Sequence, residues 1–170
     1  DMAKLIKAFY SYPGDEEALS KGTKNVSKSL LPLIAIPTTS GSGSEATHFA
    51  VVYIGHEKFS LASKYLLPEF VILDGSLVTS GSSYQKACNV LDAMAQAIES
   101  YWACGSNAES RLYSQRALQL GWDIIGEFVN GADDLEIAQT MIEASNLAGQ
   151  AINISKTTAC HAWSYAFTSS

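Results

Sequence analysis

The feature that most constrains this chain is a change in hydrophobic periodicity near Ser82. Before it, apolar residues form short runs of strand length, bounded by turn-forming residues, as in LLPLIAIP and FVILD. After it, apolar residues recur at helical spacing over three long segments, residues 82–103, 107–131 and 133–153. The pattern predicts an α/β part over residues 1–81, followed by an all-helical part over residues 82–170.

Individual elements follow from the same reading. The first twelve residues have helical spacing, and Pro13 and Gly14 end that helix. Residues 13–25 read as a polar connection. Residues 30–39 predict a buried strand, and residues 48–54 and 70–74 predict two more. In the helical part, Asn107 and either Asp133 or Asp134 are candidate N-caps, and Gly131 is a candidate stop.

Charge and cysteine usage exclude several classes. The net charge is −6 without any basic stripe, which argues against nucleic acid and anionic membranes as partners. No apolar run reaches the length of a membrane span. The odd set Cys88, Cys104 and Cys160 lacks metal-type spacing, so we expect reduced thiols and a cytoplasmic protein. Both ends of the chain read as cut, and we expect a longer protein.

A loop of small residues, PTTSGSGSEAT at positions 37–47, follows the first predicted strand. Such loops let backbone N–H groups approach a ligand closely, because no large side chains intervene. The hydroxyls of Thr38, Thr39 and Thr47 could bond a ribose or an amide. A plain polar turn explains the composition equally well. The glycine spacing differs from the dinucleotide fingerprint.

Asp92 and Gln96 lie one helical turn apart among apolar residues, so they share a face. A buried carboxylate needs a partner, which could be a metal ion, a helix cap or an arginine. His161, among small and aromatic neighbours, reads either as a core histidine or as a ligand. Lys156 could serve an anionic ligand or solvent. We interpret His48 and His56 as surface or structural residues.

Taken in order, these stretches resemble the iron-containing (group III) alcohol dehydrogenase family. DMAK at residues 1–4 looks like the end of that family's glycine-rich phosphate loop, without its glycines. IAIPTTSGSGSEAT is similar to its second cofactor loop, LDAMAQAIESYW to its metal-binding helix, and HAWSY to a later ligand segment. The resemblance implies a dehydroquinate synthase-like fold. Residues 1–81 would be an incomplete Rossmann-like dinucleotide-binding domain, and residues 82–170 an incomplete all-helical metal and substrate domain.

The resemblance also implies site residues. NAD(P) would be bound by Thr38, Thr39, Ser42, Thr47 and Lys58, with the lysine reaching the ribose. A divalent metal, Fe or Zn, would be bound by Asp92, Gln96 and His161. Gln96 stands where the family has histidine, so we expect weaker metal binding, a different ion or metal-free chemistry. The family's last ligand would follow Ser170, and Tyr165 occupies a substrate-side position that is usually histidine.

The implied reaction is NAD(P)-dependent interconversion of an aldehyde and a primary alcohol, with Tyr165 and Lys156 as catalytic groups. NISKTTACHAWSY resembles the phosphonoacetaldehyde reductase branch, so we expect a phosphonate-bearing aldehyde held by Lys156 with Ser155, Thr157 and Thr158. We further expect a homodimer and no turnover by the isolated chain. The alternatives are a non-catalytic fragment and a relative of glycerol dehydrogenase or dehydroquinate synthase.

Overall fold

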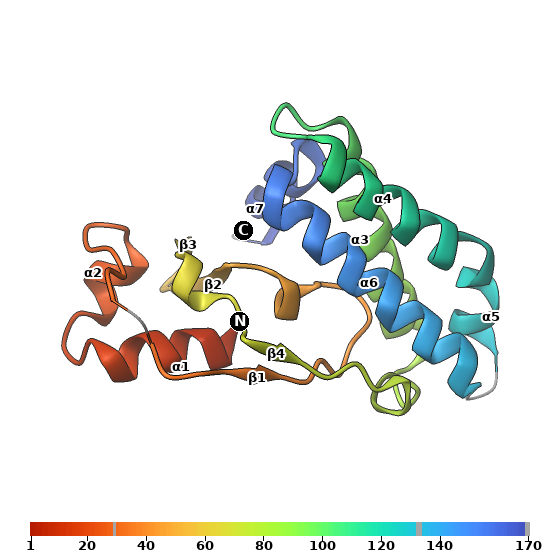
Figure 1. Ribbon diagram of the computed structural model, residues 1–170, viewed down its shortest axis with the longest axis horizontal. Helices are drawn as coiled ribbons and strands as arrows, with labels where there is room; N and C mark the ends of the chain where they lie inside the picture. Colours follow the sequence, from red (N-terminus) through yellow and green to blue (C-terminus); the bar gives the residue numbers. More distant parts are fainter. Residues whose placement is uncertain (29, 132–133, 169–170) are drawn as a thin grey trace.

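The computed structural model describes residues 1–28, 30–131 and 134–168, without the side chains of residues 165, 166 and 168. The α-helices are α1 Met2–Ser11, α2 Glu16–Ser20, α3 Ser83–Trp102, α4 Ala108–Gly121, α5 Ile125–Asn130, α6 Leu135–Ser155 and α7 Ala159–Thr168. The strands are β1 Ile34–Ala35, β2 Phe49–Ile54, β3 Glu57–Ala62 and β4 Phe70–Val71. Short 3-10 helices cover Ser44–Ala46, Lys64–Leu66, Gly75–Val78 and Trp122–Ile124. Figure 1 shows the α/β elements on one side and α3–α6 on the other.

The α/β part contains two separate two-stranded sheets. β1 and β4 are parallel, with Ile34 opposite Phe70, and β2 and β3 form an antiparallel hairpin. Helix α1 contacts β2, and its Leu5 and Ala8 enter a core that also contains Ala50 and Leu61 from the hairpin. The helix therefore begins at the junction of the two parts and covers the hairpin (Figure 1).

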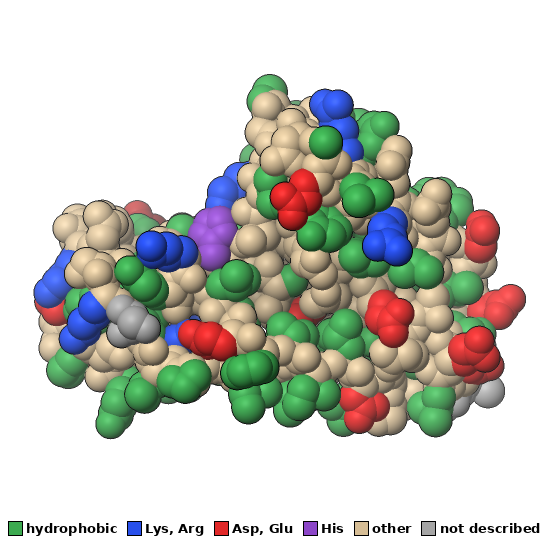
Figure 2. Space-filling view, in the orientation of Figure 1, with side chains coloured by type: hydrophobic (Ala, Val, Ile, Leu, Met, Phe, Trp, Pro, Cys, Tyr) green, Lys and Arg blue, Asp and Glu red, His purple; other side chains and the backbone are tan. Residues whose placement is uncertain are grey.

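The prediction of a buried strand over residues 30–39 is wrong for this chain. Only Ile34–Ala35 are extended and paired, Ile34 is 58% exposed, and Phe70 on the neighbouring strand is 65% exposed. A parallel sheet becomes buried only when other elements cover its faces, and the described chain supplies just two strands here. Figure 2 shows the resulting row of hydrophobic side chains along the lower edge of the α/β part.

The segment interpreted as a polar connection contains helix α2. Asp15 precedes it, Glu16 and Glu17 lie in its first turn, and acidic side chains stabilise a helix N-terminus. Leu19 is fully buried and anchors the helix in the α/β core. One apolar anchor in a charged segment gives too weak a periodic signal to predict a helix of this length.

Helices α4 and α6 begin at predicted caps: Asn107 forms a capping box at α4, and Asp134 caps α6. The Ser82 side chain caps α3, which was not predicted. Asp133 lies outside the described residues. Gly131 is the C-cap of α5, as predicted. The segment predicted as one helix over 107–131 is divided by the 3-10 turn Trp122–Ile124, directly after Gly121, which has a low helix propensity.

Small side chains bring α3, α4 and α6 close together. Ala97, Ala117 and Ala148 come from these three helices, are fully buried and form one cluster. Larger side chains, including Met94, Met141 and Phe128, fill a second core next to it. None of the helices in the described ranges combines the length and apolarity needed to cross a bilayer.

The loop at residues 37–47 joins the two parts through backbone contact. Gly43 has a φ of +55°, and a Cβ built on Gly149 of α6 would lie 2.5 Å from the Gly43 carbonyl oxygen. Beside this contact, Asn146 donates a hydrogen bond of 2.9 Å to the buried Glu45 carboxylate. The loop therefore has a fixed position on α6. The domain boundary at residue 81 stays a prediction.

Candidate functional site

A cavity of about 480 Å³ lies against the loop at residues 37–47. Thr38, Thr39 and Ser42 line it, together with the first turn of α1 and the backbone around β1. The volume lies within the range of small-molecule sites. The structure therefore places three of the predicted cofactor residues on one cavity wall.

Thr47 does not line this cavity, contrary to the prediction. Its hydroxyl oxygen accepts a hydrogen bond of 2.8 Å from Lys4 Nζ, which also donates to the Phe49 carbonyl oxygen at 2.9 Å. Thr47 and Lys4 are 1% and 2% exposed. Burial lowers the pKa of Lys4 to about 8, against the opposing effect of the Glu45 carboxylate. Thr47 is therefore part of the support behind the loop.

Asp1 makes a second connection between α1 and the loop, which the sequence reasoning missed. Its carboxylate accepts hydrogen bonds from the Ser44 hydroxyl and from the Val51 backbone N–H, the latter at 2.9 Å. Asp1 and Lys4 are one helical turn apart, and this spacing was the signal that could have identified them.

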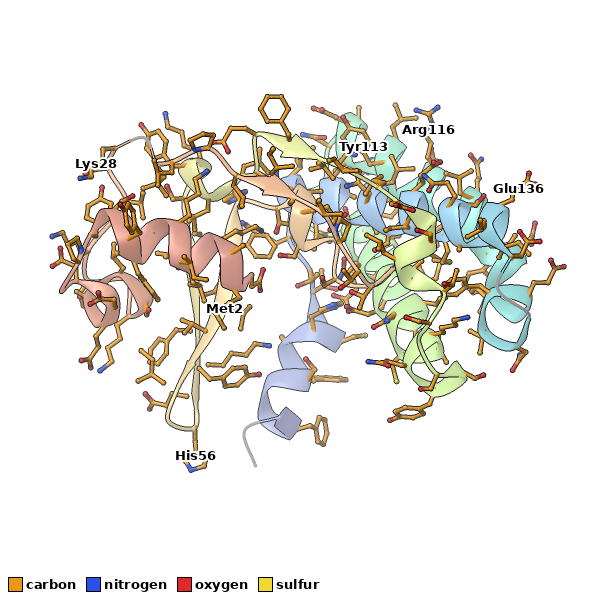
Figure 3. All side chains as sticks on the ribbon, turned by 90° about the horizontal axis from the view of Figure 1, so that it is seen from below. Met2, Lys28, His56, Tyr113, Arg116 and Glu136 are labelled. Atoms are coloured by element: carbon orange, nitrogen blue, oxygen red, sulfur yellow. The ribbon has the colours of Figure 1, made fainter. Side chains whose placement is uncertain are left out.

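Lys58 lies on β3, opposite Tyr53 of β2, and is half-buried. It is not among the described residues that line the cavity at Thr38. Its predicted role at the cofactor ribose therefore stays a prediction. His56 is at the tip of the same hairpin, which projects on the same side of the molecule as α7 (Figure 3).

Asp92 and His161 meet although they are 69 residues apart. Asp92 Oδ1 on α3 lies 3.2 Å from His161 Nε2 on α7. The hydrogen bond with Asp92 raises the pKa of His161; burial opposes this increase, and the nearby Glu99 carboxylate supports it. The imidazole is therefore more easily protonated than usual when no other cation is present.

Gln96 lies one turn after Asp92 and is 4% exposed. Its Oε1 is buried and has no hydrogen-bond partner among the described residues. Such a group costs about 1–3 kcal/mol unless something binds it. Over residues 1–28, 30–131 and 134–168, no three His, Cys, Asp or Glu side chains form a group that could hold a metal ion. A metal bound by Asp92 and His161 would therefore need a third ligand of another type, such as the Gln96 carboxamide oxygen.

Glu99 is a buried carboxylate at the same place, and the sequence reasoning did not select it. One of its oxygens lies 3.2 Å from His161 Nδ1. Asp92, Gln96 and Glu99 follow an i, i+4, i+7 pattern, which marks one face of a helix. That pattern was the signal that could have identified Glu99.

Lys156, His48 and Asn153 form a polar cluster between the two parts. Lys156 Nζ lies 3.2 Å from His48 Nε2 and 4.8 Å from the centroid of the Phe49 ring. His48 Nδ1 lies 2.5 Å from Asn153 Oδ1, so Nδ1 carries the proton and Nε2 accepts from the ammonium. Burial lowers the pKa of His48, and the Lys156 charge adds to this effect while Asn153 opposes it.

The backbone at Lys156 is unusual. Its φ is +69° with ψ of 176°, a region that residues with side chains rarely adopt. The conformation follows directly after α6 and directs the chain towards α7. The cost of such a conformation is about 1–3 kcal/mol.

The prediction of an anion cluster around Lys156 is wrong for Ser155, and its other members stay predictions. Ser155 is 6% exposed, and its hydroxyl donates 2.7 Å to Ser100 in the interior, because it lies on the inner face of α6. The Thr158 hydroxyl accepts from the Trp102 indole at 3.2 Å. Ser155 therefore cannot face a ligand beside Lys156. The Tyr165 side chain lies outside the described residues.

Comparisons with known proteins agree along both parts. Residues 1–75 match the family model "Iron-containing alcohol dehydrogenase", and residues 86–170 match "Fe-containing alcohol dehydrogenase family, C-terminal". The "Probable alcohol dehydrogenase EutG" of Escherichia coli is 31% identical over 97% of this chain and 42% of its own length. A phosphonoacetaldehyde reductase of Streptomyces viridochromogenes is 31% identical over 80% of this chain and 35% of its own.

A solved structure shows the same fold. Sulfoacetaldehyde reductase from Bifidobacterium kashiwanohense, in complex with NAD+, superimposes with a TM-score of 0.92 at 29% identity, covering 97% of this chain and 44% of that one. The chain thus spans well under half the length of these relatives. The expected α/β part followed by helices is confirmed as the fold class.

Proposed function

Because this chain belongs to the iron-containing alcohol dehydrogenase family, we propose that it is part of an enzyme that interconverts an aldehyde and a primary alcohol with NAD(P). The observation that carries the proposal is the contact between Asp92 and His161, one helical turn from Gln96, whose buried oxygen has no hydrogen-bond partner among the described residues. The three side chains come from two different helices, and the cofactor loop is fixed on a third. This arrangement supports a site between the two parts of the chain.

We assign Thr38, Thr39 and Ser42 to the cofactor. On the side of Thr38, Thr39 and Ser42 the cavity wall is made of small residues, so the backbone there can approach a phosphate or ribose closely. The cofactor supplies the hydride, and these residues would orient it. Lys4 and Asp1, at the start of α1 beside the same cavity, keep the loop in place through Thr47 and Ser44.

Asp92, Gln96 and His161 suit a divalent metal ion such as Fe²⁺ or Zn²⁺. The set offers a carboxylate oxygen, a carboxamide oxygen and an imidazole nitrogen, and the carboxamide oxygen is buried without a partner in the part of the chain that the structure describes. When bound, such an ion polarises the substrate carbonyl as a Lewis acid. His161 must then present a free Nε2 lone pair, so the proton that Asp92 stabilises there has to leave.

The substrate side is assigned to Lys156 and Tyr165, and we propose that the aldehyde carries an anionic group such as a phosphonate. Lys156 keeps two N–H donors after bonding His48, and neither His48 nor Phe49 neutralises its charge. Two relatives are named for aldehydes that bear an anionic group, phosphonoacetaldehyde and sulfoacetaldehyde. Tyr165 stays a predicted group near the reacting carbonyl.

The test uses the longer protein that contains this chain, loaded with Fe²⁺ or Zn²⁺ after chelation. Oxidation of NADH and NADPH is measured with phosphonoacetaldehyde and with propionaldehyde. Lys156→Met should raise KM for the anionic aldehyde about tenfold or more, corresponding to about 1.4 kcal/mol, and leave that for propionaldehyde unchanged. Lys28→Met, at the far edge of the α/β part (Figure 3), is the matched control. Equal loss on both aldehydes would contradict the anionic substrate.

Metal dependence is tested separately, with Asp92→Asn. This variant should lose the activity that metal restores, because an amide oxygen replaces the charged ligand. Full activity of metal-free Asp92→Asn would contradict the metal assignment. A homodimer also stays a prediction, and light scattering after size exclusion would decide it.

A further inference from the structure

Glu99 is a buried carboxylate that the proposed chemistry leaves without a role. It lies on α3, seven residues after Asp92, and is 1% exposed. A buried charge is unfavourable unless hydrogen bonds and opposite charges surround it. Glu99 shares a helix face with Asp92 and Gln96, so its hydrogen-bond partners bear on the same site.

Glu99 contacts the start of α7 through Thr158 and His161. One carboxylate oxygen accepts the backbone N–H of Thr158 at 2.5 Å, and the other accepts the backbone N–H of His161 at 3.3 Å. The first N–H groups of a helix lack partners within the helix. Burial would raise the pKa of Glu99, but the Thr158 N–H and the His161 side chain outweigh it, so the pKa lies below its usual value. Glu99 thus caps α7 as a carboxylate from a neighbouring helix.

The same carboxylate faces the His161 ring. Glu99 Oε2 lies 3.2 Å from Nδ1, and Asp92 Oδ1 lies 3.2 Å from Nε2 on the other edge of the imidazole. Nδ1 is buried and makes no well-aligned hydrogen bond among the described residues, so Glu99 contacts it at ion-pair distance. The ring is therefore held between two carboxylates from one helix.

We propose that Glu99 is a positioning residue, which holds a proton on His161 Nδ1 and so leaves Nε2 free to bind a metal beside Asp92. Metal-binding histidines usually donate their second ring N–H to a carboxylate or carbonyl, which fixes the tautomer and the ring plane. Here the orienting carboxylate also starts the helix that carries the histidine. The ring orientation and the position of α7 therefore depend on one side chain. The metal part of this inference rests on the proposed function, whereas the tautomer does not.

The experiment is ¹⁵N NMR of the histidine rings in the chelator-treated chain, at a pH where the imidazole is neutral. Signals of His161 are identified by their loss in His161→Gln. Because Asp92 competes for the proton at Nε2 when no metal is bound, the comparison is made in Asp92→Ala, where the proton should lie on Nδ1. In Asp92→Ala/Glu99→Gln, the carboxamide N–H₂ can donate to Nδ1, and the proton should move to Nε2. Glu45→Gln, which alters another buried glutamate, should leave the His161 signals unchanged.

Metal retention in a chelator competition is measured on the same proteins. Glu99→Gln should retain metal about 10–100-fold less tightly than wild type, and Glu99→Asp should recover part of the loss. A proton on Nε2 in Asp92→Ala, or an unchanged tautomer in Asp92→Ala/Glu99→Gln, would overturn the proposal even if metal binding fell. A tautomer change between these two variants, in a protein whose wild type binds no metal, would support the positioning role of Glu99 and overturn the metal assignment of the proposed function. If the Glu99→Gln proteins fail to fold, the tautomer in Asp92→Ala alone decides.

Discussion

Replacing Gly149 by alanine tests the contact that fixes the cofactor loop on α6. The new Cβ would lie 2.5 Å from the Gly43 carbonyl oxygen and 2.9 Å from the Gly43 Cα. Both neighbours are backbone atoms, so the loop or the helix must move by several tenths of an ångström. Overpacking of this kind costs about 1–3 kcal/mol. Alanine recovers about 1 kcal/mol in helix propensity, so we expect a net destabilisation of up to about 2 kcal/mol.

The assay is urea unfolding of wild type and variant, followed by circular dichroism. Gly126→Ala is the matched control, because it also lies in a helix and its Cβ would meet only open space. That control should gain up to about 1 kcal/mol from helix propensity. A Gly149→Ala protein as stable as Gly126→Ala would refute the close contact, and with it the fixed position of the loop.

Three further predictions concern single side chains. Gln96→His in the full-length protein should retain Fe²⁺ or Zn²⁺ about 10–100-fold more tightly, because imidazole suits these ions better than a carboxamide; equal retention in a chelator competition would place Gln96 away from the metal. The pKa of Lys4 is lowered to about 8, so the unfolded chain binds its proton more tightly, and the free energy of unfolding should rise by about 3 kcal/mol between pH 8 and pH 10.5. Lys4→Met should lack this rise in urea titrations at the two pH values. The raised pKa of His161 predicts a pH dependence of opposite sign for the free energy of unfolding when a chelator keeps the site metal-free. The stabilisation by His161 is present below pH 6.5 and is lost as pH rises past the pKa in the folded state. Asp92→Asn should reduce this loss.

Local rules predicted much of the helical part from the sequence. Asn107 and Asp134 cap helices where their spacing from the apolar stripe placed them. The shared face of Asp92 and Gln96 needed only the helical period. The contact between Asp92 and His161 joins residues 69 positions apart, and helical periodicity does not predict such a tertiary contact. Only the resemblance to the family suggested it.

The wrong predictions share a physical cause. The identity of a hydroxyl or apolar residue does not determine which tertiary neighbours surround it. Thr47 and Thr38 lie in sequence stretches of similar composition. The Thr47 hydroxyl, however, accepts a hydrogen bond from Lys4 and is buried. Ser155 next to Lys156 looked available and points into the interior. Ile34 reads as a core residue and is exposed, because burial depends on neighbours that residues 30–39 do not contain.

At Lys156, backbone stability is opposed to the substrate-binding role that we propose for its ammonium group. Its φ of +69° would suit glycine, which adopts that region without strain. A selection of this protein for thermal stability alone would therefore favour glycine at position 156, and with it the loss of the ammonium group beside His48. Thermostable variants obtained in that way should be screened against an anionic aldehyde before they are accepted as improved enzymes.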